Sequence, residues 1–331
     1  MTTESVQDIE RSITKRIDSI THIDDAHLGT KIPAPKSVKI ELTARCNYRC
    51  SFCALAEREE QPKNDMSREL FSRIVQEMAA AGVKEIGLFY IGESFLNIDL
   101  LEWACRKAKA AGIEYCFLTT NGSLATPDKV KRLMEAGLNS LKFSMTTADD
   151  EQFEKVIGAP KALRYKAIEN LKAARKVRDE GHYNCGIYAS SIKYDDDQME
   201  KAQQVAEEIK PHVDQHYWLP LYSFGSLAVD AQKETGLTGT TPGNMGRIGG
   251  LVTPIPCWCA FTEGHVLYDG RLTLCGFDNG GGQWVCGDLN TQSFMEAWNS
   301  KFAIELRAAH LRRKIVGTVC ETCAMYGGKK S

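Results

Sequence analysis

Three cysteines early in the chain, Cys46, Cys50 and Cys53, have a spacing that can hold a metal cluster. Iron–sulfur clusters are bound by cysteine thiolates, usually four of them, so a compact group of three leaves one iron without a protein ligand. An open metal position can accept a substrate. A cysteine-rich loop or a zinc site are the alternatives, but structural zinc sites use paired Cys-x2-Cys spacing. The triplet therefore favours an iron–sulfur cluster with one exchangeable position.

A second group of cysteines lies near the C-terminus, at Cys257, Cys275, Cys320 and Cys323. Asp269-Gly270 stands between two short apolar runs and predicts a tight β-hairpin. Cys257 and Cys275 flank this hairpin, so their thiols and the later Cys-x2-Cys pair can close a complete four-cysteine site. Ligation by cysteine alone allows either zinc or an iron–sulfur cluster here.

The elements that must position these groups alternate between strands and helices. Apolar alternation predicts strands over 37–43, 85–91, 113–120, 140–144, 185–192 and 215–221, and helical periodicity predicts helices near 67–82, 98–111, 127–136, 162–180 and 196–209. Apolar spacing also predicts a core-facing helix over 291–311, in which we assign Trp298 a packing role. This order predicts an α/β fold with a parallel sheet. Polar and glycine-containing segments follow the strands, where such folds place their chemistry. Periodicity alone does not distinguish a curled sheet from a doubly wound one.

The Cys-x3-Cys-x2-Cys motif, with Phe52 just before the third cysteine, resembles that of the radical S-adenosylmethionine (SAM) enzymes. The resemblance implies a partial (β/α)6 barrel. It also implies that the methionyl amine and carboxylate of SAM bind the open iron of a [4Fe–4S] cluster. One electron then cleaves SAM to a 5′-deoxyadenosyl radical.

The same resemblance implies a set of SAM contacts. Phe52 would contact the adenine, and Gly92-Glu93 stands where the family has Gly-Gly-Glu, which binds the methionyl ammonium. Ile91 replaces the first glycine, and Ser94 replaces a common proline. Ser144, at the end of a predicted strand, matches the family's polar residue near the ribose or carboxylate of SAM. Asn121 and Ser190 are further candidates of the same kind, which can instead cap the next helix.

The C-terminal pattern, Cys-x12-Gly-x4-Cys followed after 44 residues by Cys-x2-Cys, resembles the Twitch domain, the short form of the SPASM extension. The resemblance implies an auxiliary [4Fe–4S] cluster on Cys257, Cys275, Cys320 and Cys323. The longer SPASM form has three further cysteines after the last pair, and the sequence ends at Ser331, so we predict two clusters. Cys259 has three alternative roles: a ligand in place of Cys257, a hydrogen-atom donor to a substrate radical, or an inert thiol. The spacing from Asp269-Gly270 favours Cys257 as the ligand.

Length and composition indicate more than one domain. We expect a helical or loosely ordered N-terminal leader over 1–36, the barrel over 37–221, a glycine-rich bridging loop over 222–256 and the Twitch domain over 257–331. Lys and Arg number 41 against 43 Asp and Glu, so we predict no nucleic-acid partner. No apolar run approaches the length of a spanning helix and no signal peptide is present, which predicts a cytoplasmic protein that does not bind membranes. Its twelve cysteines would remain reduced there.

The predicted function is that of a radical SAM oxidoreductase or isomerase. It would oxidise or epimerise a small molecule, namely a sugar, aminocyclitol or nucleoside, with a reductant such as flavodoxin or ferredoxin. Residues 1–36 are too few for a separate leader-peptide-binding domain, so we expect a small substrate in preference to a peptide. A peptide-modifying maturase and a non-catalytic iron–sulfur electron-transfer protein are the alternatives. Tyrosine, lysine, histidine and arginine side chains near the expected cavity offer no spacing that assigns an acid–base role.

Overall fold

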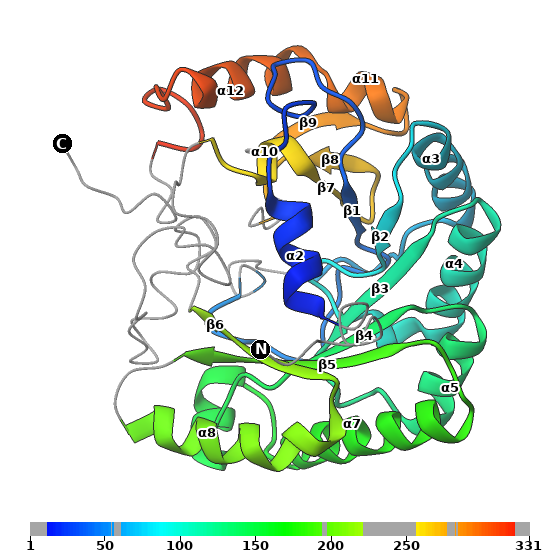
Figure 1. The fold of residues 1–331 in the computed structure, drawn as a ribbon, viewed down its shortest axis with the longest axis vertical. Helices are drawn as coiled ribbons and strands as arrows, with labels where there is room; N and C mark the ends of the chain where they lie inside the picture. Colours follow the sequence, from blue (N-terminus) through cyan, green and yellow to red (C-terminus); the bar gives the residue numbers. More distant parts are fainter. Residues whose placement is uncertain are drawn as a thin grey trace, which may run out of the picture.

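The computed structural model describes residues 12–53, 55, 61–193, 197–220, 256–276, 282 and 284–321. Figure 1 shows one curved sheet with helices packed along its outer side. The strands are β1 (Ser37–Ile40), β2 (Glu85–Gly87), β3 (Tyr115–Thr120), β4 (Ser140–Ser144), β5 (Gly186–Lys193), β6 (Gln215–Pro220), β7 (Glu263–Val266), β8 (Arg271–Thr273) and β9 (Val285–Asp288). The main helices are α2 (Ile13–Thr21), α3 (Arg68–Ala80), α4 (Ile98–Ala110), α5 (Pro127–Glu135), α7 (Ala162–Glu180), α8 (Asp197–Ile209), α11 (Phe294–Trp298) and α12 (Lys301–Leu311). Shorter helical segments are η2 (Ser94–Asn97), α6 (Asp150–Gln152), η3 (Phe153–Ile157), η4 (Lys210–His212) and α10 (Cys259–Thr262).

The sheet has the strand order β6-β5-β4-β3-β2-β1-β7-β8-β9, and β1 to β6 are parallel neighbours in sequence order. A doubly wound sheet would reverse its strand order part-way. Here β1 to β6 follow one another across the sheet without a reversal, and the described strands do not close into a complete barrel. This is the arrangement of a partial (β/α)6 barrel. The fold class predicted from the sequence is confirmed.

Each strand of the barrel has one face toward the helices and one toward the interior. In β3, Cys116, Leu118 and Thr120 are buried, while the alternating positions, among them Tyr115 and Thr119, are only partly buried. Apolar side chains on α4 pack in the same core as these buried strand residues. The interior face therefore keeps its polar and aromatic side chains available to line cavities.

The C-terminal hairpin extends the same sheet. β7 pairs in parallel with β1, with Ser37 opposite Glu263, and β7, β8 and β9 then pair antiparallel. Gly270 lies in the hairpin loop with φ +93°, a backbone conformation that favours glycine. The hairpin predicted from Asp269-Gly270 is confirmed, and its cysteines are attached directly to the barrel.

The continuous helical pattern expected over 291–311 is wrong, because two helices occupy this region. Ser300 caps α12 by accepting a hydrogen bond from the Ala303 N–H at 3.3 Å. The side chain of Asn299 bonds the backbone of Ile32, accepting from its N–H and donating to its carbonyl. These contacts end α11 and restart the chain as α12. Trp298 is fully buried between them, which fits its predicted packing role.

Helix α2 accounts for the helical character predicted in the N-terminal leader. It lies on the interior side of the barrel (Figure 1), where Ile13 packs against Tyr188 and Tyr217. Residues 222–255 of the predicted bridging loop, and Cys323, lie outside the described residues. The predicted domain boundaries therefore remain predictions.

Candidate active site

The loop that carries the cysteine triplet follows β1 and is held by hydrogen bonds to distant segments. Gln61 bonds Cys46 twice, accepting from its N–H at 3.1 Å and donating to its carbonyl at 3.0 Å. The N–H groups of Arg49 and Ser51 donate to the carbonyls of η3, at 2.9 and 2.8 Å. The chain's own hydrogen bonds thus hold the loop at the C-terminal end of the barrel strands.

The three cysteines are partly buried and lie close to one another. Burial raises the pKa of Cys46 to about 12, with a smaller contribution from the charge of Glu93. The pKa of Cys50 lies well above its ordinary value because of burial and then because of the charges of Cys53 and Cys46. Thiolates at these positions therefore require a bound cation. No three His, Cys, Asp or Glu side chains of the described chain converge on a single-ion site. A cubane spreads its thiolates over separate irons, so the arrangement is compatible with a cluster.

Gly92 lies against the backbone that leads into the cysteine loop. A Cβ atom at this position would stand 2.0 Å from the Thr43 carbonyl oxygen and 2.8 Å from that of Arg45. The next residue, Glu93, donates its N–H to the same Arg45 carbonyl at 2.8 Å. Only glycine permits this approach, which joins the end of β2 to the cluster loop.

The carboxylate of Glu93 is buried, with 2% of the residue exposed. It accepts hydrogen bonds from the Phe95 N–H at 3.0 Å, the Asn121 N–H at 2.8 Å and the Thr120 hydroxyl at 3.0 Å. Burial raises the pKa of Glu93, and the hydrogen bonds it accepts act in the opposite direction. Glu93 therefore ties the ends of β2 and β3 together beside the thiols.

A cavity of about 190 Å³ lies beside these groups. Besides the three cysteines, most of the predicted SAM contacts line it: Phe52, Gly92, Glu93, Asn121 and Ser144. Ser190 is not among the described residues that line it. Its side chain is buried on β5, at the register position opposite Ser144. The structure thus brings together five of the six predicted contacts.

A small amide and hydroxyl network was missed by the sequence reasoning. Asn121 Nδ2 donates to Asn47 Oδ1 at 2.9 Å, and Asn47 Nδ2 donates to Ser123 Oγ at 2.9 Å. Asn47 lies between the first two cysteines, so this network fixes the cluster loop to the end of β3. The only signal in the sequence was the position of a polar residue inside the motif.

The C-terminal cysteines gather at a second place. Cys259 shares a thiol hydrogen bond with Cys257, and this bond, together with burial and the nearby Cys275 charge, raises the pKa of Cys259. Cys259 is 4% exposed and is not among the described residues that line the 190 Å³ cavity. Cys320 is buried and follows α12. Cys257, Cys259 and Cys275 are therefore neighbours.

His310 and Tyr90 support this second place, and neither was predicted. The Cys257 N–H donates to His310 Nδ1 at 3.3 Å. Burial lowers the pKa of His310 to about 4, so its ring is neutral at neutral pH and Nδ1 can accept this bond. The Tyr90 hydroxyl donates to the Cys275 carbonyl at 3.0 Å, and Tyr90 also lines the 190 Å³ cavity. The two cysteine sites thus meet at Tyr90.

Comparisons with known proteins agree with this geometry. A model of the radical SAM superfamily matches residues 40–210, just over half of the chain. The chain belongs to the radical SAM superfamily. A second model, an iron–sulfur cluster-binding domain, matches residues 257–324. This radical SAM enzyme accordingly uses SAM, a [4Fe–4S] cluster and an auxiliary cluster, and the cysteines and cavity described above fit that set.

The curated relatives that the chain matches carry the names of different enzymes, among them a GTP 3′,8-cyclase and an AdoMet-dependent heme synthase. GTP 3′,8-cyclase from Tolumonas auensis is 33% identical over 140 residues, which are 42% of this chain and 40% of that protein. The chain spans about two fifths of the length of the curated relatives that it matches first. Among solved structures, BtrN in complex with AdoMet and 2-DOIA has a TM-score of 0.56 at 13% identity, over 89% of this chain and 94% of BtrN.

Streptococcus suis SuiB bound to its precursor peptide SuiA has a TM-score of 0.60 at 15% identity, over 83% of this chain and 66% of SuiB. At these identities, the two structures establish the fold alone. No described helix has the length and apolar character needed to cross a lipid bilayer.

Proposed function

We propose that this radical SAM enzyme reductively cleaves SAM and removes a hydrogen atom from a small molecule, which it oxidises or epimerises. The observation that carries the proposal is the single cavity shared by the cysteine triplet, Gly92, Glu93, Asn121 and Ser144. A non-catalytic iron–sulfur protein would not need this cavity beside its cluster.

When bound, the cluster and SAM supply one electron and a 5′-deoxyadenosyl radical that abstracts a hydrogen atom. The chain's own residues bind and orient. Phe52 offers an aromatic face for the adenine. The backbone of Gly92-Glu93, held against Arg45, positions polar groups for the methionyl end, and Asn121 and Ser144 offer hydrogen bonds along the same wall.

The substrate class we propose is a sugar, aminocyclitol or nucleoside. In the oxidising outcome, the 5′-deoxyadenosyl radical would take one hydrogen atom from a carbinol carbon. The auxiliary cluster would accept the second electron and solvent the hydroxyl proton, which leaves a ketone. In the epimerising outcome, the substrate radical would take a hydrogen atom on its opposite face from the Cys259 thiol. The thiyl radical left on sulfur would then need one electron from the reductant and one proton from solvent. The likeness to BtrN extends over nearly all of both chains, which supports a small substrate. A precursor peptide is the alternative, because SuiB shares the fold.

We further propose a cytoplasmic location and a flavodoxin or ferredoxin as reductant. The cysteines support the location, since thiols that must bind iron remain reduced in that compartment. If SAM cleavage is lost when flavodoxin or ferredoxin replaces dithionite, the proposed reductant is contradicted.

Anaerobic reconstitution tests the proposal directly. The full chain with iron, sulfide, SAM and dithionite should form 5′-deoxyadenosine, which is quantified by chromatography. Metabolite extracts from a strain that lacks the gene should then contain a compound that the enzyme consumes. If 5′-deoxyadenosine does not rise above an enzyme-free blank, SAM cleavage is not an activity of this chain.

Loss of Cys320 is expected to act mainly on the auxiliary site. The Cys320→Ala enzyme should contain less iron and unfold at lower denaturant concentration, because ligand binding and local folding are coupled, yet keep part of its SAM cleavage. Iron analysis and unfolding curves measure this. Cys286→Ala removes another buried thiol, on β9, and serves as the control. Equal iron in the wild-type and Cys320→Ala enzymes would count against the auxiliary cluster on this residue.

Cys259 keeps its proposed role as a hydrogen-atom donor, and turnover in deuterium oxide tests it. A thiol exchanges its hydrogen with solvent, so the wild-type product should gain deuterium at the inverted carbon and the Cys259→Ala enzyme should not deliver it. Mass spectrometry measures the label. Iron content is determined in parallel, because the neighbouring Cys257 and Cys275 make a ligand role the competing explanation. Identical products and label in both enzymes would end the donor role.

A further inference from the structure

Tyr90 contacts both cysteine sites. Its hydroxyl donates a hydrogen bond to the Cys275 carbonyl at 3.0 Å, although the two residues are 185 positions apart in the chain. The residue also lines the 190 Å³ cavity beside the cysteine triplet. It packs, together with Cys46 and Cys53, against a small apolar cluster that includes Ile91. A single side chain therefore forms part of the wall of one site and is bonded to the backbone of the other.

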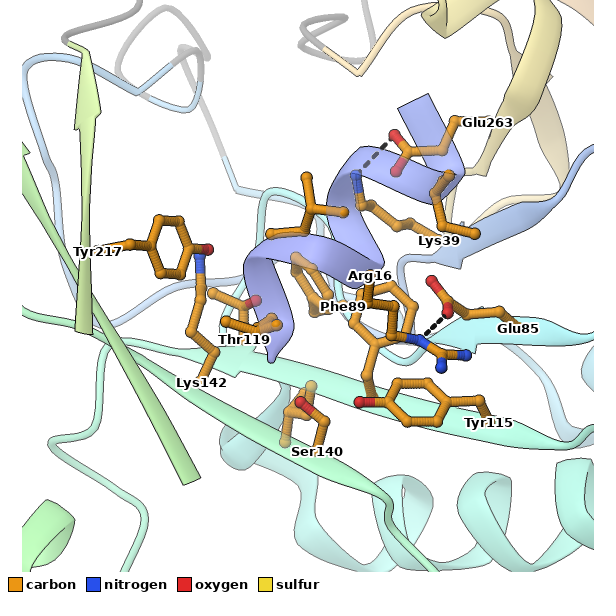
Figure 2. A pocket seen from close by; sticks show the side chains of 15 residues that line it. Arg16, Lys39, Glu85, Phe89, Tyr115, Thr119, Ser140, Lys142, Tyr217 and Glu263 are labelled. Atoms are coloured by element: carbon orange, nitrogen blue, oxygen red, sulfur yellow. Dashed lines mark hydrogen bonds and ion pairs between the residues drawn. The ribbon is translucent and has the colours of Figure 1, made fainter. Parts of the chain in front are cut away.

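His265, on β7, supports the ring of Tyr90. The centroids of the two rings are 5.2 Å apart, and the ring planes are tilted by 46°. His265 is fully buried, and its Nε2 lies 3.3 Å from Glu263 Oε2. Lys39 Nζ lies 2.8 Å from the same carboxylate oxygen, and Figure 2 shows this ion pair beside α2 in the barrel interior. The tyrosine ring thus rests on a side chain that is itself held from the barrel.

The same histidine lies against the chain just after Cys275. A Cβ atom at Gly276 would stand 3.0 Å from His265 Nε2 and 3.3 Å from its Cε1, so a larger residue would press on the ring. The Cys275 N–H donates to Thr273 Oγ1 at 3.4 Å. The backbone of Cys275 is therefore fixed at its N–H, at its carbonyl and at the following residue, and the bond at the carbonyl comes from Tyr90.

A group that holds a cysteine ligand in this way acts on the metal centre as well as on the ligand. Partners outside the ligands orient them and tune the metal. The reduction potential of an iron–sulfur cluster depends on net charge, hydrogen bonds and solvent exposure around it. The hydroxyl of Tyr90 donates toward Cys275, so the positive end of the O–H dipole is directed at this segment. A positive end favours the reduced form of a cluster, because that form carries one more negative charge.

We propose that Tyr90 is a positioning residue for the auxiliary cluster: its hydroxyl fixes the Cys275 segment and raises the reduction potential of the cluster bound there. This role depends on Cys275 as a ligand and not on SAM cleavage. In the oxidising outcome proposed above, the same potential decides how readily the second electron leaves the substrate radical. That consequence alone rests on the proposed function.

Redox titration of the reconstituted full-length enzyme without SAM, followed by electron paramagnetic resonance, tests this role. The signal shared with a variant whose triplet cysteines are all replaced by alanine belongs to the auxiliary cluster. Tyr90→Phe should shift the midpoint potential of that signal to a more negative value. It should also release iron from the auxiliary site to a chelator roughly tenfold faster, since loss of a group that orients a ligand weakens metal binding. Tyr165→Phe removes an exposed hydroxyl that donates to Asp150 at 2.8 Å and should change neither.

A second replacement separates the hydrogen bond from the space that the hydroxyl fills. 4-Fluorophenylalanine at position 90 fills that space but cannot donate, so it should show the same negative shift, and it takes the place of Tyr90→Phe should that variant fail to fold. A wild-type potential in either folded variant, or no signal in the variant without the triplet, would overturn the role of Tyr90. The formation of 5′-deoxyadenosine by the same wild-type preparation is measured separately, so failure of this role and failure of SAM cleavage are distinguished.

Discussion

The Cys50→Ala enzyme is expected to form no 5′-deoxyadenosine beyond an enzyme-free blank. With one of three thiolates lost, a second iron of the cluster has no protein ligand, and the site that should bind SAM is no longer a single defined position. The charges of Cys46 and Cys53 both act on Cys50, so loss of the Cys50 side chain also removes the thiol that lies close to the other two. The same loss is expected for Cys46→Ala and Cys53→Ala.

Chromatographic analysis of anaerobic reactions with SAM and dithionite measures this effect, and electron paramagnetic resonance of the reduced enzyme reports the cluster. Cys105→Ala is the matched control. Cys105 is a buried cysteine of α4 that belongs to neither proposed ligand set, and its thiol donates to the Ala136 carbonyl at 3.6 Å. If Cys50→Ala cleaves SAM as fast as Cys105→Ala, the triplet does not hold the reactive cluster.

Local patterns in the sequence predicted those features that depend on local chemistry. The spacing of the triplet is fixed by the ligation of one cluster, so it can be read without knowing the fold. β4 over Ser140–Ser144 and α7 over Ala162–Glu180 match the predicted ranges at both ends. The alternating or helical spacing of apolar residues within one segment is enough to predict such strands and helices.

Features that depend on contacts between distant segments could not be predicted in this way. The bond between His310 and the Cys257 backbone joins residues 53 positions apart, and Arg16 reaches Glu85 across 69 positions. The break between α11 and α12 depends on Asn299 binding Ile32, a residue of the N-terminal segment. No periodicity within 291–311 carries that information, because the partner lies elsewhere in the chain.

The Gly92→Ala enzyme is expected to lose both stability and SAM binding. The new methyl group would meet backbone oxygens at 2.0 and 2.8 Å, and backbone atoms cannot rotate away as a side-chain end can. Overpacking of this kind typically costs about 1–3 kcal/mol in the free energy of unfolding. Relief of the clash requires the Gly92-Glu93 turn to move away from the cysteine loop, which breaks the 2.8 Å bond from the Glu93 N–H to Arg45.

Denaturant unfolding measures the first effect, and SAM affinity of the reconstituted enzyme measures the second. Gly29→Ala is the control, because its added Cβ would meet Ile32 and Lys31 at ordinary contact distances of 3.4 and 3.5 Å; its free energy of unfolding should change by less than about 1 kcal/mol. A Gly92→Ala enzyme that binds SAM like the wild type would mean that the turn is free to shift without disturbing the methionyl site. In that case the residues that follow β2 do not position SAM, and the contacts of Asn121 and Ser144 would have to suffice.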